Sequence, residues 1–165
     1  MTGREELILI AELGAAFAGF LAIFLIFARR EGRFSPADSL RVRSIIVSSL
    51  TAVFLALVPL GMNLYGLQGA ILWRTVSVVG LALGVGVSLH VGLRQYALPA
   101  EERAAVGFVH SNVAWGLVIA SVVLLASNIF GLFSEPSAAP YVTALICCLG
   151  VATSNFVTIA FQRLL

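Results

Sequence analysis

Apolar residues along this chain gather in five long runs, which short polar connections separate. Each run is about as long as the roughly 20 residues that cross the hydrocarbon core of a bilayer. Lipid offers no hydrogen-bond partner to a bare backbone, and the runs lack the alternation typical of barrel strands. The pattern therefore predicts an all-α fold, a polytopic bundle of five transmembrane helices. We expect these helices near 6–28, 44–64, 70–93, 106–132 and 141–162.

The composition agrees with this prediction. Of the 165 residues, 60% are apolar and 11% are charged, whereas soluble domains are about 45–50% apolar and about 25% charged. A soluble enzyme and a disordered chain are therefore excluded. The first apolar run is too long for a cleavable signal and lacks a basic n-region. We expect one transmembrane domain over 1–165, in the cell membrane, most simply a bacterial inner membrane.

The basic residues predict an orientation. All ten are arginines, and the second and fourth connections contain none of them. Because cytoplasmic loops are enriched in basic residues, the first and third connections and the C-terminus are predicted to be cytoplasmic, with the N-terminus outside. Arg94 and Arg103 lie in the third connection. The first connection carries five arginines that could also bind anionic lipid headgroups, namely Arg29, Arg30, Arg33, Arg41 and Arg43.

Two connections also carry helix-start patterns. Ser35 precedes Pro36, and Asp38 follows in the first turn, which is typical of a capped helix N-terminus. Pro99, followed by Glu101, is a similar start without the capping serine. Both helices are therefore expected to begin in water. Pro59 is expected to kink the helix over 44–64.

The two halves after the first helix resemble each other. The alternative to a true duplication is coincidence in a small apolar alphabet. The hypothesis we prefer is a duplicated hairpin, copy A over about 36–94 and copy B over about 99–163, related by a pseudo-two-fold axis along the membrane normal. The matching segments, in order, are 36–38 with 99–101, 63–67 with 128–132, and 83–88 with 149–154. In the second match, an aromatic anchor precedes a glycine that permits a left-handed helix end.

Small residues follow one face of several helices. In lipid, such faces allow close backbone approach, which replaces the hydrophobic drive of soluble proteins. We therefore expect the helices over 70–93 and 141–162 to form the central pair. The alternative is ordinary tight packing without a functional role. The residues predicted to pack closely are Gly19, Ser77, Gly80, Gly84, Ser88 and Gly150.

The first helix carries a carboxylate well inside a predicted span. An isolated charge in the bilayer costs several kcal/mol and normally faces protein or water. We expect Glu12 and Arg74 to lie at similar depth and to pair within or between subunits; the alternative makes Glu12 a cation- or proton-binding group. A separate stripe, running from Leu13 through Phe17 and Phe20 to Phe27, faces either lipid or a subunit interface.

The remaining polar residues offer weaker candidates. Ser154, Asn155, Thr158 and Gln162 could line a polar path, or hydrogen-bond across helices. His90, His110 and Asn112 near the inner face could bind a metal or sense pH, although interfacial packing is the more ordinary interpretation. Cys147 and Cys148 are interpreted as packing residues. No cofactor, metal or nucleic acid is predicted.

The sequence carries no catalytic constellation, so we do not expect an enzyme. We expect a small membrane protein that assembles as a homo-oligomer and forms a channel- or transporter-like path for ions or small solutes. The alternative is a non-transporting scaffold, sensor or accessory subunit that binds partner helices.

Overall fold

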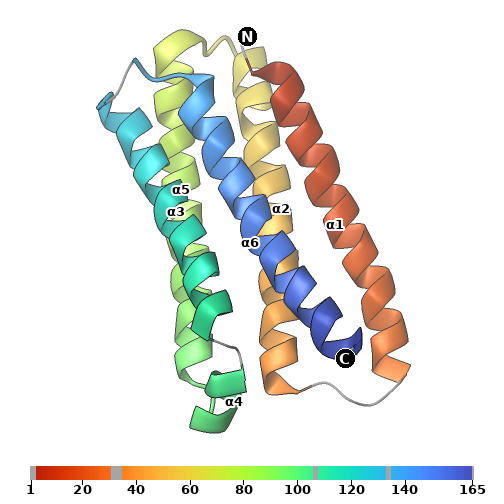
Figure 1. The fold of residues 1–165 in the computed structure, drawn as a ribbon. Helices are drawn as coiled ribbons and strands as arrows, with labels where there is room; N and C mark the ends of the chain where they lie inside the picture. Colours follow the sequence, from red (N-terminus) through yellow and green to blue (C-terminus); the bar gives the residue numbers. More distant parts are fainter. Residues whose placement is uncertain (1–2, 31–34, 106–107, 133–134, 165) are drawn as a thin grey trace.

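The computed structural model describes residues 3–30, 35–105, 108–132 and 135–164. Within these ranges, the side chains of 24–30, 37, 103–105, 108–110 and 161–164 are outside the description. The described elements are all helices (Figure 1): α1 (Arg4–Arg30), α2 (Pro36–Leu64), α3 (Gly69–Tyr96), α4 (Ala100–Ala105), α5 (Phe108–Phe130) and α6 (Ala138–Leu164).

Five of these helices are long and apolar enough to cross a membrane, namely α1, α2, α3, α5 and α6. This confirms the predicted all-α fold with five helices that are able to span a membrane. The sixth helix, α4, is a six-residue segment at one end of the bundle. We call the end that holds α4 and the C-terminus the lower end, and the end that holds the N-terminus the upper end, as in Figure 1.

The helices α2, α3, α5 and α6 form a four-helix bundle, and α1 packs on its outside against α2 and, less extensively, α6 (Figure 1). Around the bundle, α2 adjoins α3 and α6, and α5 also adjoins α3 and α6. Because α3 and α6 stand diagonally, they contact each other only slightly. The expected central pair is therefore wrong: α6 packs against α2 and α5 instead.

The helix boundaries follow the local sequence chemistry. The Ser35 hydroxyl accepts a hydrogen bond of 3.1 Å from the Asp38 amide, and Pro36 opens α2. Gly66 and Gly131, in the chain reversals after α2 and α5, have φ of +86° and +65°. These left-handed positions favour glycine because a Cβ would meet the following carbonyl.

The prolines at the starts of the two predicted hairpins both precede a helix. Pro36 begins α2, which is continuous through Pro59. The equivalent Pro99 precedes α4, and residues 106 and 107, between α4 and α5, lie outside the described part of the chain.

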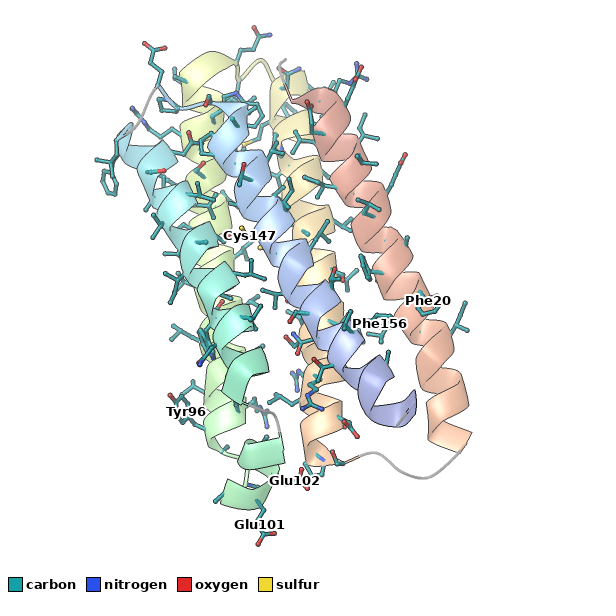
Figure 2. The ribbon with its side chains drawn as sticks, viewed as in Figure 1. Phe20, Tyr96, Glu101, Glu102, Cys147 and Phe156 are labelled. Atoms are coloured by element: carbon teal, nitrogen blue, oxygen red, sulfur yellow. The ribbon has the colours of Figure 1, made fainter. Side chains whose placement is uncertain are left out.

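The upper half of the bundle is a continuous apolar core. It contains Leu55, Val76, Leu125, Tyr141 and Leu145, which come from all four bundle helices and are at most 3% exposed. Leu7 and Ile10 of α1 join the same cluster. A smaller cluster, centred on Leu21, Ile45 and Ile159, joins α1 to α2 and α6 in the lower half. Phe20 and Phe156 add an edge-to-face contact there, with ring centroids 5.5 Å apart (Figure 2).

Candidate functional site: two polar cavities inside the bundle

The lower half of the bundle contains a partly open cavity of about 80 Å³, which we call the first cavity. All four bundle helices line it, and each contributes polar side chains. The polar lining residues are Arg41, Ser44 and Ser48 of α2, Ser88 and Gln95 of α3, Ser111 of α5 and Asn155 of α6. A cavity of this size holds a few water molecules or a small ion.

A second cavity of about 40 Å³ lies beside the first. Thr51, Gly84, Ser121 and Cys148 line only the second cavity. Both cavities share the five residues Ser48, Val87, Ser88, Val118 and Val151, which we call the collar. The two cavities therefore adjoin at the collar. We call them together the polar interior for their polar side chains, although apolar side chains supply the larger part of their surface.

Arg41 is the charged residue of this interior. Its side chain is 3% exposed although it lies on the second turn of α2. Its Nη1 lies 3.4 Å from the Asp38 carboxylate, one turn earlier on the same helix. Among the described residues that line the first cavity, Arg41 is the sole charged one, and none is a carboxylate.

Amide and hydroxyl groups link the helices around the first cavity. The Asn155 amide of α6 donates to the Ser44 hydroxyl of α2 at 3.4 Å and to its own helix at the Val151 carbonyl at 2.9 Å. The Gln95 amide of α3 donates to the Ser111 hydroxyl of α5 at 3.3 Å. Both cross-helix bonds are near the upper limit of hydrogen-bond length, so they hold the lining groups weakly.

One aromatic side chain forms part of the same lining. Trp115 of α5 packs its ring over Gly92 of α3, where an added Cβ would lie 3.2 Å from the ring. The absence of a side chain at Gly92 thus allows the indole to lie between the two helices, beside the first cavity.

The upper apolar core closes the polar interior at its other end. The Tyr141 hydroxyl of α6 donates a hydrogen bond of 2.7 Å to the Leu55 carbonyl of α2. Just above, the Asn128 amide of α5 donates to the Ser77 hydroxyl of α3 at 2.9 Å and to the Ser137 carbonyl at 3.2 Å. These bonds tie the four helices together above the cavities, so we call this region the upper seal.

The structure brings several residues predicted from sequence into or beside this site. Asn155 lines the first cavity, Ser88 belongs to the collar, and Gly84 lines the second cavity. Gly80 packs closely below the upper seal, where an added Cβ would lie 3.4 Å from Leu125 and 3.6 Å from Tyr141. Two further residues of the small-residue set, Ser77 and Gly150, pack against Asn128 and Leu117.

Other candidates lie elsewhere. His90 and Asn112 are exposed on α3 and α5. Thr158 donates back to the Ser154 carbonyl of its own helix at 3.0 Å, and neither of these residues lines the first or the second cavity. The side chains of His110 and Gln162 are outside the described residues. Of the predicted polar path, Asn155 is thus the member that the structure places in the interior.

Glu12 and Arg74 are both exposed, on helices that do not pack closely together. No ion pair joins them within the described part of the chain. Gly3, just before α1, lies beside Trp73 of α3 and so marks the depth of its neighbour Arg74. Glu12 lies nine residues after Gly3, about 13 Å further along α1 at about 1.5 Å per residue. Contrary to the expectation of similar depth, Glu12 therefore lies deeper than Arg74.

The face of α1 that packs on the bundle differs from both faces considered in the sequence. Leu7, Ile10, Gly14 and Leu21 are buried, and Gly14 fits against Val53 and the Ser49 carbonyl of α2. The small-residue face with Glu12 is exposed, and an added Cβ at Gly19 would meet no atom within 4 Å. Phe20, in the aromatic stripe, is 58% exposed. The small-residue face is thus directed away from the bundle, whereas the aromatic stripe reaches α6 through the contact of Phe20 with Phe156.

Arg41 is among the arginines expected to contact lipid headgroups, but its side chain is 3% exposed and lines the first cavity. Arg43, two positions later, is exposed. Residues two positions apart on a helix point in directions that differ by about 200°. Because Arg43 faces outward, Arg41 faces inward. The sequence offered one sign of this: Arg41, Ser44 and Ser48 recur at spacings of three and four, which places them on one helix face.

Comparisons with protein-family models, curated proteins and solved structures give no match. The fold and the cavities define the class of this protein: a multi-pass helical membrane protein with two small cavities, lined in part by polar side chains, on one side of an apolar seal.

Proposed function

We propose that this protein passes a small ion or small polar solute through the interior of its four-helix bundle. The observation that carries the proposal is the pair of adjoining cavities, which all four bundle helices line with polar groups. Polar groups inside a membrane bundle are costly unless they pair with one another or line a water-filled path, and they commonly mark solute and ion pathways.

The upper seal supports a transporter-like mechanism in preference to an open pore. It blocks the interior at the upper end through the apolar core and the Tyr141–Leu55 and Asn128–Ser77 hydrogen bonds. Passage therefore requires the four helices to separate at the upper seal. Until they separate, the solute stays at or below the collar. A single chain lines both cavities, so the site itself needs no second subunit; assembly into an oligomer stays a separate prediction.

The proposed orientation places the lower end in the cytoplasm. Both arginine-rich connections lie at this end (Figure 1), together with the C-terminus and Glu101 and Glu102 of α4 (Figure 2). The excess of arginine at the lower end is the pattern expected of a cytoplasmic face. The first cavity is then accessible from the cytoplasmic side.

The duplicated hairpin is part of this proposal. The α2–α3 and α5–α6 hairpins occupy opposite sides of the bundle, as a pseudo-two-fold axis along its length would place them. The left-handed glycines Gly66 and Gly131 recur at equivalent positions. Such an axis would run through the polar interior, so that each copy supplies one half of the path.

The test uses purified protein in liposomes loaded with potassium chloride, and separately with glycerol. We expect at least one of chloride, potassium and glycerol to leave faster than from protein-free vesicles. Ser88→Leu fills the collar and should slow this release several-fold. Val78→Leu, on the exposed side of the same helix, and Glu12→Gln should leave the rate unchanged. Ser48→Leu fills the collar from α2 and serves if Ser88→Leu does not fold.

One observation favours the alternative of a non-transporting module that binds partner helices. The exposed face of α1 with Ala15 and Gly19 is open and has the small-residue spacing typical of membrane helix contacts. Vesicles that hold all three solutes as tightly as protein-free vesicles would refute the transport proposal and leave this alternative in its place.

A further inference from the structure

We infer that the collar and the second cavity take a small uncharged solute with hydroxyl or amide groups, and that Ser48, Thr51 and Ser88 bind it. The inference rests on the proposed function, because it names the class of solute that the same interior passes. Three features carry it: the hydroxyl groups of the lining, the position of the charges and the size of the second cavity.

The hydroxyl groups around the collar are available to a solute. Ser48 and Thr51 of α2 and Ser88 of α3 line the second cavity, and their side chains form no hydrogen bond within the described part of the chain. Ser121 of α5 donates to the Ala144 carbonyl at 3.2 Å, which leaves its oxygen able to accept. A hydroxyl donates one hydrogen bond and accepts up to two. The lining is therefore complementary to a solute that does both, such as an alcohol or an amide.

The charges lie away from the collar. No charged residue is among the described residues that line the second cavity. Arg41 lines the first cavity, and the Asp38 carboxylate, 3.4 Å from its guanidinium, offsets its charge. Ser48 lies seven residues after Arg41, about 10 Å further along α2 at about 1.5 Å per residue. An ion at the collar would therefore lose water without gaining an opposite charge, which is costly in a low dielectric.

Backbone oxygens do not replace the water of an ion at the collar either. Selective ion pathways place rings of backbone carbonyls or of charged side chains at their narrow points. The helices α2, α3, α5 and α6 continue past both cavities, so their carbonyls accept hydrogen bonds within each helix. A neutral solute loses far less on leaving water, and a few hydroxyl groups can compensate for that loss. The lining thus favours an uncharged solute over a cation or an anion.

The size of the second cavity limits the solute. Its volume is about 40 Å³, which holds about three water molecules at about 10–15 Å³ for each. Gly84 contributes to this space, because an added Cβ there would meet no atom within 4 Å. Urea is close to this size, and glycerol can extend through the collar into the first cavity. Drug-sized ligands need pockets of about 300–1,000 Å³ and are excluded.

The first test compares neutral and charged solutes in the same vesicles. Purified protein is reconstituted into liposomes, and the passage of urea, glycerol, potassium and chloride is measured. We expect urea and glycerol to cross several-fold faster than in protein-free vesicles, and potassium and chloride to stay at the protein-free rate. The double variant Ser48→Ala/Ser88→Ala removes two hydroxyl groups without filling the collar and should slow urea and glycerol several-fold. Val78→Leu, on the exposed side of α3, is the matched control and should change nothing.

Cys148 allows a measurement that does not depend on transport, because it lines the second cavity and not the first. In the Cys147→Ser protein in mild detergent, Cys148 is the single thiol, and mass spectrometry follows its alkylation. Iodoacetamide is neutral, iodoacetate is its anionic analogue with the same leaving group, and 2-bromoethylamine is a cation. Relative to their rates with 2-mercaptoethanol, iodoacetamide should react with Cys148 several-fold faster than either charged reagent. Ser88→Leu, which fills the collar, should slow the iodoacetamide reaction several-fold, and Ser48→Leu serves if Ser88→Leu does not fold.

Passage of potassium or chloride as fast as glycerol, or equal relative rates for the three alkylating reagents, would overturn the inference. So would an iodoacetamide reaction that the collar variants leave unchanged, since the reagent would then reach Cys148 without passing the collar. Selective alkylation by the neutral reagent without passage of any solute would refute the proposed transport and leave the site for an uncharged solute standing. Passage of ions together with unselective alkylation would do the opposite.

Discussion

The Tyr141 hydroxyl donates to the carbonyl that Pro59 leaves without a helical partner. Within an α-helix, the carbonyl of Leu55 would accept from the amide of residue 59, but proline has no N–H to give. Tyr141 supplies the missing donor from α6 at 2.7 Å. Leu55 and Tyr141 are at most 1% exposed, so this carbonyl has no access to water and depends on the cross-helix bond. The proline of α2 and the tyrosine of α6 thus act together in the upper seal.

Removing the tyrosine hydroxyl should therefore destabilise the protein. Tyr141→Phe keeps the ring that packs on Trp73, with centroids 5.8 Å apart, and leaves the Leu55 carbonyl unpaired. We expect a loss of about 1–3 kcal/mol in the free energy of unfolding in mixed detergent micelles. Tyr65→Phe, at a tyrosine that is 89% exposed, is the matched control and should have no effect.

The proline provides a sharper test of the same relationship. Pro59→Ala restores an amide that can bond to the Leu55 carbonyl, so the double variant Pro59→Ala/Tyr141→Phe should lose less stability than Tyr141→Phe alone. A double-mutant cycle measures this coupling. Strictly additive losses would show that Tyr141 does not serve the carbonyl that Pro59 leaves unpaired.

The polar half of the upper seal should also contribute to stability. Asn128 is 2% exposed and bonds to Ser77 and to both backbone groups of Ser137. Asn128→Ala removes these bonds and should lower the unfolding free energy by about 2–3 kcal/mol. Asn112→Ala, at an exposed position on the same helix, should change it by no more than about 0.5 kcal/mol. Equal effects of the two variants would contradict the structure.

The packing of α1 predicts opposite outcomes for two of its glycines. A Cβ at Gly14 would lie 2.7 Å from Val53 and 3.0 Å from the Ser49 carbonyl, whereas one at Gly19 would meet no atom within 4 Å. We expect Gly14→Ala to cost about 1–3 kcal/mol and to loosen α1 from α2. Gly19→Ala should be neutral or slightly stabilising in the monomer. Thermal unfolding and cross-linking of α1 to α2 would measure both effects.

The proposed orientation predicts which ends of the bundle are accessible from each side. After both native cysteines are replaced by alanine, Arg43→Cys should react with a membrane-impermeant maleimide only once the cytoplasmic side is opened. Tyr65→Cys, at the upper end, should react in intact cells. Both positions are exposed, so burial does not limit either reaction. The reverse pattern of labelling would place the lower end outside.

The sequence alone determined the helices and the number of spans, because a backbone in lipid must satisfy its hydrogen bonds within each segment. It also determined local ends such as the Ser35 cap and the left-handed Gly66 and Gly131, since these depend on neighbouring residues only. Tertiary structure decided which face of each helix points inward. In a soluble protein, the apolar face of a helix marks its interior side. Here lipid is as apolar as the protein core, so that guide is lost.

Arg41 and Arg43 show the consequence. Both are arginines near the start of α2, yet Arg41 lines the interior and Arg43 is exposed. On α1, neither the aromatic nor the small-residue stripe is the packed face, because Gly14 alone allows the close approach to α2. The polar interior likewise arises only when four helices each turn a few hydroxyls and amides toward a common axis. No single helix carries enough hydroxyl and amide groups for its sequence to predict this shared interior.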